Sequence, residues 1–177
     1  MTIQPLTKSD AALSFCGTYR YRLDRVWGTG ERLGWCLLNP ATAGRETNDP
    51  TTIRAAGFSR ANGYDGMSVV NLYARRTTDP YQLNDDTLDH AGPEYWDYIE
   101  DVWREVSAVV CAWGANPLAV QRADVVIGTM RRMYPVMPLL CLGPTKAGAP
   151  RAPLYLPLST ELVPYTHAGV DEDVACW

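Results

Sequence analysis

Short apolar runs separated by polar segments of helical length make up the main pattern along the chain. The runs cover 32–38, 67–73, 106–112 and 138–142. Apolar runs of this length bounded by turn residues are typical of buried strands. The segments between them predict helices over 50–61, from 84–86 to about 105, and over about 117–133. Because strand and helix alternate, we expect a three-layer α/β/α domain around a central, mainly parallel four-stranded sheet.

Residues 18–27 show a different pattern, in which polar and apolar side chains alternate with the period of a half-buried strand. The turn residues Gly28 to Glu31 follow, so this strand is predicted to form an edge hairpin with 32–38. We expect a single domain over the 177 residues, with 1–15 as a loose leader and 164–177 as a peripheral tail.

Each central apolar run ends in a polar or glycine-rich loop. In open α/β sheets the ligand crevice lies at the carboxyl ends of the strands. We therefore expect a site where four loops converge, namely 39–52, 71–80, 113–117 and 143–151.

The first of these loops holds the two residues predicted to be catalytic. Asn39 follows the apolar run directly; its amide can orient a water or a substrate carbonyl but is a poor general base. Asp49 precedes Pro50, a pair that predicts a helix N-cap. If it faces the crevice, Asp49 is also the best candidate base. Pro40 and Thr42 are predicted to contact the substrate.

Further binding candidates lie in the other loops and at the start of the first predicted helix. Asn71 lies inside an apolar run, so its amide either ties the loop together or reads a ligand. Trp113 either packs in the core or stacks on a ligand, with Gly114 beside it. Cations near these loops are predicted to hold phosphate, together with the backbone around Thr145: Arg54, Arg75, Arg76, Lys146 and Arg151. An exposed, solvated role is an alternative for Arg54, and a charged strand exit is one for Arg75 and Arg76.

Composition and charge narrow the function classes. A net charge of −4 and a pI near 5.1 oppose nucleic-acid binding by the whole surface but allow a local basic patch. No apolar run approaches the roughly 20 residues of a membrane span. The N-terminus lacks the pattern of a signal peptide. Five widely spaced cysteines without C-x-x-C predict reduced thiols and a cytoplasmic protein.

Several motifs of known enzymes and metal sites are absent from the sequence. The glycine-rich loop 143–151 lacks the spacing of a P-loop, which disfavours nucleoside triphosphate binding of that type. Neither a nucleophile elbow nor a dinucleotide fingerprint is present. With only two histidines, a structural zinc site has little to draw on, and we expect neither a metal nor a cofactor.

Over about residues 18–157 the chain resembles the bacterial and phage family named domain of unknown function 1643. The matching segments are Tyr21 to Trp27, Leu38 to Ala43, Asp49 to Thr51, Asn71 to Ala74 with Arg76, Thr78 to Pro80, Ala112 to Gly114, and Cys141 through Lys146 to Leu156. The family name implies no reaction.

The order of these motifs is also similar to that of the uracil-DNA glycosylase superfamily, in particular its mismatch-specific branch. That resemblance implies that the Asn39-Pro40 loop positions the attacking water, and that the segment from Asn71 to Thr77 and the loop Gly143-Pro144-Thr145 correspond to later motifs. Such enzymes flip a base out of the duplex and hydrolyse its N-glycosidic bond.

Three departures from these patterns keep alternatives open. Gly143 stands where the glycosylases carry His or Asn, although Lys146 could take over anion stabilisation. No aromatic residue occurs between Asn39 and Gly57, where the flipped base is usually stacked, and Ala152 replaces a His common in the uncharacterised family. We therefore expect a nucleobase-recognising enzyme acting on a base in DNA. The alternatives are a binder of modified bases or nucleotides without turnover, and an enzyme acting on free nucleotides.

Overall fold

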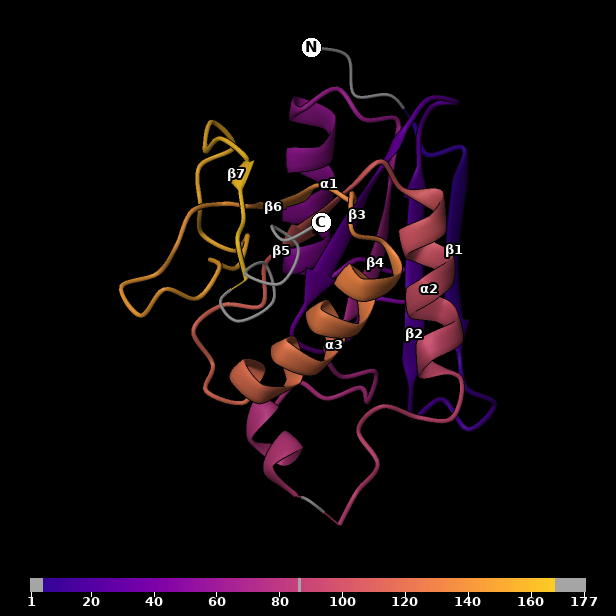
Figure 1. Ribbon diagram of the computed structural model, residues 1–177. Helices are drawn as coiled ribbons and strands as arrows, with labels where there is room; N and C mark the ends of the chain where they lie inside the picture. Colours follow the sequence, from indigo (N-terminus) through magenta and orange to yellow (C-terminus); the bar gives the residue numbers. More distant parts are fainter. Residues whose placement is uncertain (1–4, 86, 168–177) are drawn as a thin grey trace.

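The computed structural model describes residues 5–85 and 87–167, which form a mixed seven-stranded sheet with helices on both faces (Figure 1). The strands lie in the order β1-β2-β4-β3-β5-β6-β7. Their bounds are β1 Lys8–Leu13, β2 Arg20–Val26, β3 Arg32–Leu37, β4 Gly66–Asn71, β5 Ala108–Cys111, β6 Leu139–Cys141 and β7 Val163–Pro164. The α/β class expected from the alternating pattern is confirmed.

The strands formed by the four apolar runs pair in parallel in the middle of this sheet. β3 lies between β4 and β5, so that Cys36 is level with Val70 on one side and Cys111 on the other. β6 continues the parallel set beside β5. The outer strands β1, β2 and β7 run antiparallel to their neighbours. The carboxyl ends of β3 to β6 therefore lie along one edge.

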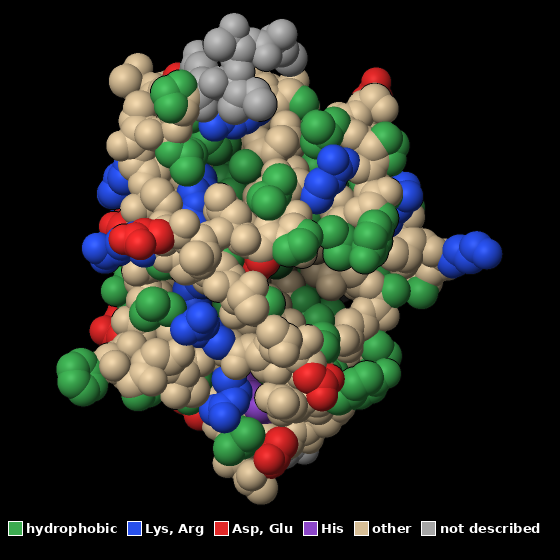
Figure 2. Space-filling model, turned by 180° about the vertical axis from the view of Figure 1, so that it is seen from behind, with side chains coloured by type: hydrophobic (Ala, Val, Ile, Leu, Met, Phe, Trp, Pro, Cys, Tyr) green, Lys and Arg blue, Asp and Glu red, His purple; other side chains and the backbone are tan. Residues whose placement is uncertain are grey.

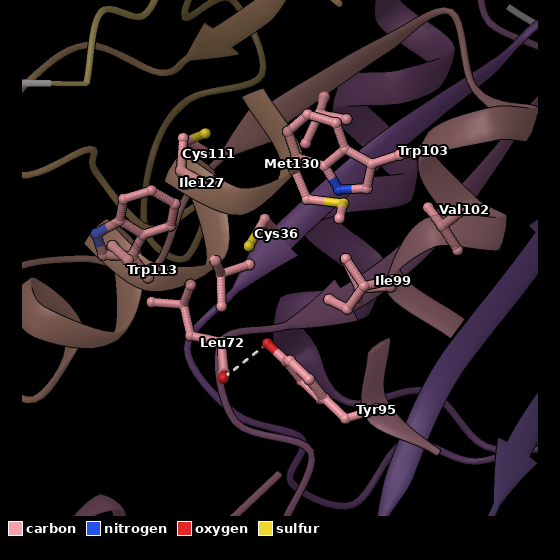
Figure 3. Close-up of a cluster of buried hydrophobic side chains, with 14 of the residues drawn as sticks. Cys36, Leu72, Tyr95, Ile99, Val102, Trp103, Cys111, Trp113, Ile127 and Met130 are labelled. Carbon is pink, nitrogen blue, oxygen red and sulfur yellow. Dashed lines mark hydrogen bonds between the residues drawn. The ribbon is translucent and has the colours of Figure 1, made fainter. Parts of the chain in front are cut away.

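Helices cover the two faces of the sheet and enclose two apolar clusters. α2 (Tyr95–Glu105) and α3 (Ala119–Met133) cover one face, where Ile99, Trp103 and Met130 join the cluster shown in Figure 3. α1 (Pro50–Ala61) covers the other face, where Phe58 packs against Trp35. Among the described residues, no helix is long and apolar enough to cross a membrane.

α1 begins as the sequence predicts. Asp49 has an extended backbone, and its Oδ1 accepts a hydrogen bond from the Thr52 N–H over 2.7 Å. Pro50 occupies the first turn, where its missing N–H is no loss. The helix ends at Asn62, and Gly63 follows with a φ of +81°, a conformation that favours glycine.

The predicted start of the second helix was wrong. Regular helix begins at Tyr95 and not at 84–86; Asp86 itself lies outside the described residues. A short 3₁₀ helix, η1, covers Pro80–Asn84 instead. Gly92 then turns with a φ of +81° so close to the β2 side that an added Cβ would lie 2.7 Å from the Tyr21 hydroxyl. The turn at Gly92 therefore has no room for a larger residue, and the chain follows an irregular path there before the helix.

The predicted edge hairpin was also wrong, because β4 lies between the two strands that were expected to pair. The turn from Gly28 to Glu31 passes over the start of β4: Trp27 N–H donates to the Asp65 carbonyl, and Asp65 N–H donates to the Glu31 carbonyl. An added Cβ at Gly30 would lie 2.8 Å from Oδ2 of Asp65, so a small residue suits this crossing.

Parts of the expected leader, 1–15, and of the expected tail, 164–177, form strands of the sheet. Residues 8–13 of the expected leader form β1, and Val163–Pro164 pair with β6 as β7. Residues 168–177 of the expected tail lie outside the described part.

β2 is not half-exposed as its alternating pattern predicted. Its polar side chains Arg20, Asp24 and Arg25 are 2%, 6% and 1% exposed. β2 lies between β1 and β4. Asp24 accepts from the Ser68 hydroxyl and pairs with Arg22, whereas Arg20 and Arg25 contact the loop after β3. Arg25 holds this loop, since its guanidinium donates to the carbonyls of Gly44 over 2.6 Å and Thr47 over 2.9 Å.

Candidate functional site

A pocket of about 360 Å³ lies at the carboxyl edge of the parallel strands. It is lined by Arg20, Leu37, Leu38, Asn39, Ala41, Asp49, Thr51, Thr52, Thr77, Thr78, Pro80, Ala112, Trp113, Ala152 and Leu154. These residues come from the start of β2, the ends of β3 and β5, the start of α1 and three connecting loops. The volume falls within the roughly 300–1,000 Å³ that is usual for small-molecule sites.

Asn39 is held in a fixed orientation at the end of β3. Its Nδ2 donates to the Thr77 carbonyl over 2.8 Å and to the Pro40 carbonyl over 3.2 Å. Because both partners are acceptors, they place the NH₂ group on their side. Among the described residues no donor reaches Oδ1. The amide oxygen is therefore free to accept from a ligand or a water.

Asp49 lines the same pocket while it caps α1. Its Oδ1 is engaged by the Thr52 N–H at 2.7 Å, whereas the Ala43 N–H reaches its Oδ2 over a longer 3.4 Å. Thr51 and Thr52 of the first helical turn also line the pocket. The positive end of the α1 dipole thus meets the pocket beside one carboxylate.

Arg20 enters the pocket from β2 and is almost fully buried, with 2% of its surface exposed. Its Nη1 donates to the Ala43 carbonyl over 3.1 Å, and its Nη2 donates to Oδ1 of Asn71 over 3.0 Å. The buried Nε has no partner. Both partners are neutral, which is unusual for a buried guanidinium.

The electrostatic surroundings of Arg20 contain more positive than negative charge. The pKa of Arg20 is lowered to about 10, mainly by burial; Asp49 acts to raise it, and Arg76 and Arg25 act to lower it. Arg20 stays protonated at neutral pH with this pKa. Two further arginines and one carboxylate thus act on the buried guanidinium.

Apolar side chains form the remaining wall. Leu37, Leu38 and Ala112 follow the strand ends, and Leu154 lies opposite in the connection after β6. Trp113 is 5% exposed and packs edge-on against Tyr165, with ring centroids 5.8 Å apart. The ring thus belongs to the core, and Trp113 also lines the pocket, while stacking on a ligand stays a prediction.

Of the predicted site residues, Asn39, Asp49 and Trp113 line this pocket. Asn71 does not: it is 2% exposed, its Oδ1 accepts from Arg20, and its buried Nδ2 has no partner. Pro40 is buried and accepts from the Thr77 N–H, whereas Thr42 is exposed. These two residues shape the loop without lining the pocket.

The predicted cations lie around the pocket but do not line it. The guanidinium of Arg54 lies over the Phe58 ring at 5.4 Å on α1. Arg76 donates to the Gly17 carbonyl over 3.3 Å, and the backbone of Arg75 bridges to Tyr19. The side chains of Lys146 and Arg151 are exposed on the surface.

The loop 143–151 folds back on itself and does not line the pocket. Ala152 and Leu154, which follow it, do. Thr145 N–H donates to the Ala149 carbonyl, and its own hydroxyl is buried without a partner. Gly114 N–H donates to the Pro150 carbonyl over 2.9 Å, with a φ of +80° at the exit of β5. This contact places Ala152, and not Lys146, at the pocket.

Sequence reasoning missed Arg20, the most buried charge of the site. Its position in an alternating strand suggested a solvent-facing side chain. The available signal was the density of charge in 20–25, where three arginines and an aspartate share six positions. So many charges in a strand beside the core call for internal partners.

A metal site requires several ligating side chains together, and a basic patch requires several cations on one face. In 5–85 and 87–167 no group of three His, Cys, Asp or Glu side chains could hold a metal ion. On the face shown in Figure 2, Lys and Arg side chains are spread among hydrophobic and acidic ones and do not gather in one patch.

Fold and pocket together define an α/β protein with a pocket at the carboxyl edge of its parallel strands. A family model described as "Protein of unknown function (DUF1643)" matches residues 20–154, and the chain belongs to this family. Comparison with curated proteins and with solved structures finds no match.

Proposed function

We propose that the pocket binds a nucleobase and that the protein hydrolyses the N-glycosidic bond of a base in DNA. The observation that carries this proposal is that Asn39 and Asp49, far apart in the loop after β3, line one pocket with Trp113. The resemblance to the mismatch-specific uracil-DNA glycosylases assigns the Asn-Pro loop to water positioning, and the free Oδ1 of Asn39 suits that role.

The proposed chemistry assigns separate tasks to the two side chains. Oδ1 of Asn39 accepts a hydrogen bond from the attacking water, whose oxygen forms a bond to the anomeric carbon of the sugar. The bond from that carbon to the base nitrogen breaks, and its electron pair leaves with the base. Asp49 takes the proton of the water through Oδ2, which has only the long contact to Ala43 N–H.

The apolar wall supports a flat, partly apolar ligand. Leu37, Leu38 and Trp113 offer apolar surface, while Asn39, Asp49 and Thr77 offer groups that can read the polar edge of a base. Trp113, which follows β5, is then the aromatic residue available to the base, since none occurs between Asn39 and Gly57. Arg20 also lines the pocket and supplies donors for a phosphate.

One observation favours a second function, recognition without turnover. Both carboxylate oxygens of Asp49 accept hydrogen bonds from backbone N–H groups, so the carboxylate is already engaged in holding the loop and the start of α1. The exposed Lys146 also lies outside the pocket, where it could not stabilise a departing base. A binder of modified bases or nucleotides would keep the same contacts to its ligand.

The test is incubation with duplexes that carry uracil, mismatched thymine or modified pyrimidines, followed by alkaline strand scission. The Asn39→Ala variant should lose strand scission, and Asn84→Ala, a change of the same type at an exposed position, should retain it. Absence of abasic product across the panel, with binding of the same duplexes intact, would favour the binding function. Absence of both product and binding would overturn the proposal.

A further inference from the structure

Arg20 is a buried cation without a carboxylate partner. It forms no ion pair with any carboxylate of the described residues, although other arginines of the chain do, for example Arg22 with Asp24 at 2.8 Å. Burying a charge without a counter-ion is costly, and proteins do so where a ligand completes the pairing. The counter-ion of Arg20 is therefore to be sought in the pocket that it lines.

The unused hydrogen-bonding capacity of Arg20 also indicates a ligand in the pocket. A guanidinium has five N–H donors. Only two hydrogen bonds are formed, to the Ala43 carbonyl and to Oδ1 of Asn71, and the buried Nε has none. These two acceptors fix the plane of the group. The remaining donors form part of a fork that suits an oxyanion with several acceptor oxygens.

The local charge balance also suits an anion. Arg25 and Arg76 act on Arg20 with the same sign, and Asp49 alone among the interacting groups acts with the opposite sign. The chain as a whole carries a net charge of −4, whereas here two further arginines lie near enough to act on Arg20.

The start of α1 adds backbone dipoles to this cluster. Thr51 and Thr52 line the pocket, and the Thr52 N–H is occupied by Asp49. The Thr51 N–H belongs to the first turn of a twelve-residue helix, where N–H groups have no intrahelical acceptor. Thr51, at the positive end of the helix dipole, thus lines the same pocket as Arg20.

We propose that Arg20 and the first turn of α1 form an oxyanion subsite that takes the phosphate group of a nucleotide ligand. The assignment to a nucleotide rests on the proposed function; the anion subsite itself rests on Arg20. The phosphate comes either from a free nucleoside monophosphate or from a phosphodiester strand. In both cases the base lies against the apolar wall formed by Leu37, Leu38 and Trp113.

Calorimetric titrations of the full chain test this subsite with inorganic phosphate, deoxyuridine, deoxyuridine 5′-monophosphate and a short single strand containing deoxyuridine. The monophosphate should bind roughly ten- to a hundred-fold more tightly than the nucleoside, as expected for charge-assisted hydrogen bonds. The Arg20→Gln variant should lose this difference and keep the affinity for the nucleoside. Tighter binding of the monophosphate than of the strand assigns the free nucleotide, and the reverse assigns the strand.

A second variant keeps the test valid if Arg20→Gln does not fold. Asn71→Asp gives Arg20 an internal carboxylate in place of the amide oxygen that now accepts at 3.0 Å. This change should lower the affinity for phosphate to the level of Arg20→Gln. Asn84→Asp adds the same charge at an exposed position and should leave the affinity within about two-fold of the wild type.

The possible outcomes separate the two proposals. Equal affinity for nucleoside and monophosphate in the wild type, or an equal loss for both in Arg20→Gln, would overturn the phosphate subsite and leave base recognition standing. Binding of inorganic phosphate that depends on Arg20, without binding of any nucleoside or nucleotide, would support the anion subsite and refute the proposed function.

Discussion

Arg20, at the start of β2, donates a hydrogen bond over 3.0 Å to Oδ1 of Asn71, at the end of β4. The two side chains meet because β2 runs antiparallel to β4, so the first residues of β2 lie at the carboxyl edge of the parallel strands. Each side chain is 2% exposed. Asn71 thus holds the one buried guanidinium of the pocket without lining the pocket itself.

Replacing Asn71 by Ala should lower the free energy of unfolding by about 1.5–3 kcal/mol, because one N–H of a buried cation loses its acceptor. The Nδ2 group of Asn71 has no partner, so its removal adds nothing to this loss. Urea denaturation would measure the change. Asn84→Ala, at an exposed position, should change stability by less than about 0.5 kcal/mol, and an equal loss in both variants would contradict the role of Asn71.

Two substitutions at Asp49 separate its structural from its chemical role. Asp49→Ala removes the cap of α1 and should cost about 1 kcal/mol of stability. Asp49→Asn keeps a side-chain oxygen for the Thr52 N–H and should stay near wild-type stability, but it removes the carboxylate from the pocket. Strand-scission assays and thermal denaturation of both variants would measure this. Full glycosylase activity in Asp49→Asn would show that Asp49 is not the base.

Replacing Tyr155 by glycine should stabilise the protein. Tyr155 is the one non-glycine residue of the described part with a positive φ, +67°, and its side chain is 92% exposed. The left-handed conformation costs tyrosine about 1–2 kcal/mol, a cost that glycine avoids. Glycine is more flexible in the unfolded chain, and ordering it on folding costs about 0.5–1 kcal/mol, which offsets part of this gain. Tyr155→Gly should therefore raise the free energy of unfolding by roughly 0.5–1 kcal/mol. A loss of stability in urea would mean that the exposed ring has a structural contact.

The four described cysteines should differ sharply in reactivity. The hydroxyls of Ser14 and Thr18, 3.4 and 3.2 Å from Sγ of Cys16, lower the pKa of this exposed thiol to about 7. Burial raises the pKa of Cys36 to about 12. Because the thiolate is the reactive form, alkylation of Cys16 should rise from pH 6 to 8, with a midpoint near 7, while Cys36 stays unmodified.

Peptide mass mapping after iodoacetamide treatment would measure these rates residue by residue, which also keeps Cys176, outside the described residues, separate. Thr18→Val removes one of the two hydroxyls and should move the midpoint for Cys16 upward. An unchanged midpoint would show that the hydroxyls do not set the pKa of this thiol.

Much of the fold was readable from local patterns. The runs at 32–38 and 67–73 predicted β3 and β4 to within one or two residues, because buried parallel strands are nearly continuous in hydrophobic residues. Asp49-Pro50 predicted the start of α1, since capping is a property of adjacent residues. The pairing of β2 and the start of α2 were not predictable in this way, because both depend on contacts between distant segments.

The sequence by itself determined the class of the protein, the order of its central strands along the chain and the place of Asn39 and Asp49 at a strand end and a helix start. These are local properties of periodicity and capping. The tertiary structure alone decided that β4 lies between β2 and β3, and hence that Arg20 and Asn71 meet. It also decided that Ala152, and not Lys146, lies at the pocket. Neighbours across a sheet are set by which surfaces pack together, and a charged residue in an alternating strand gives no sign of which loop will cover it.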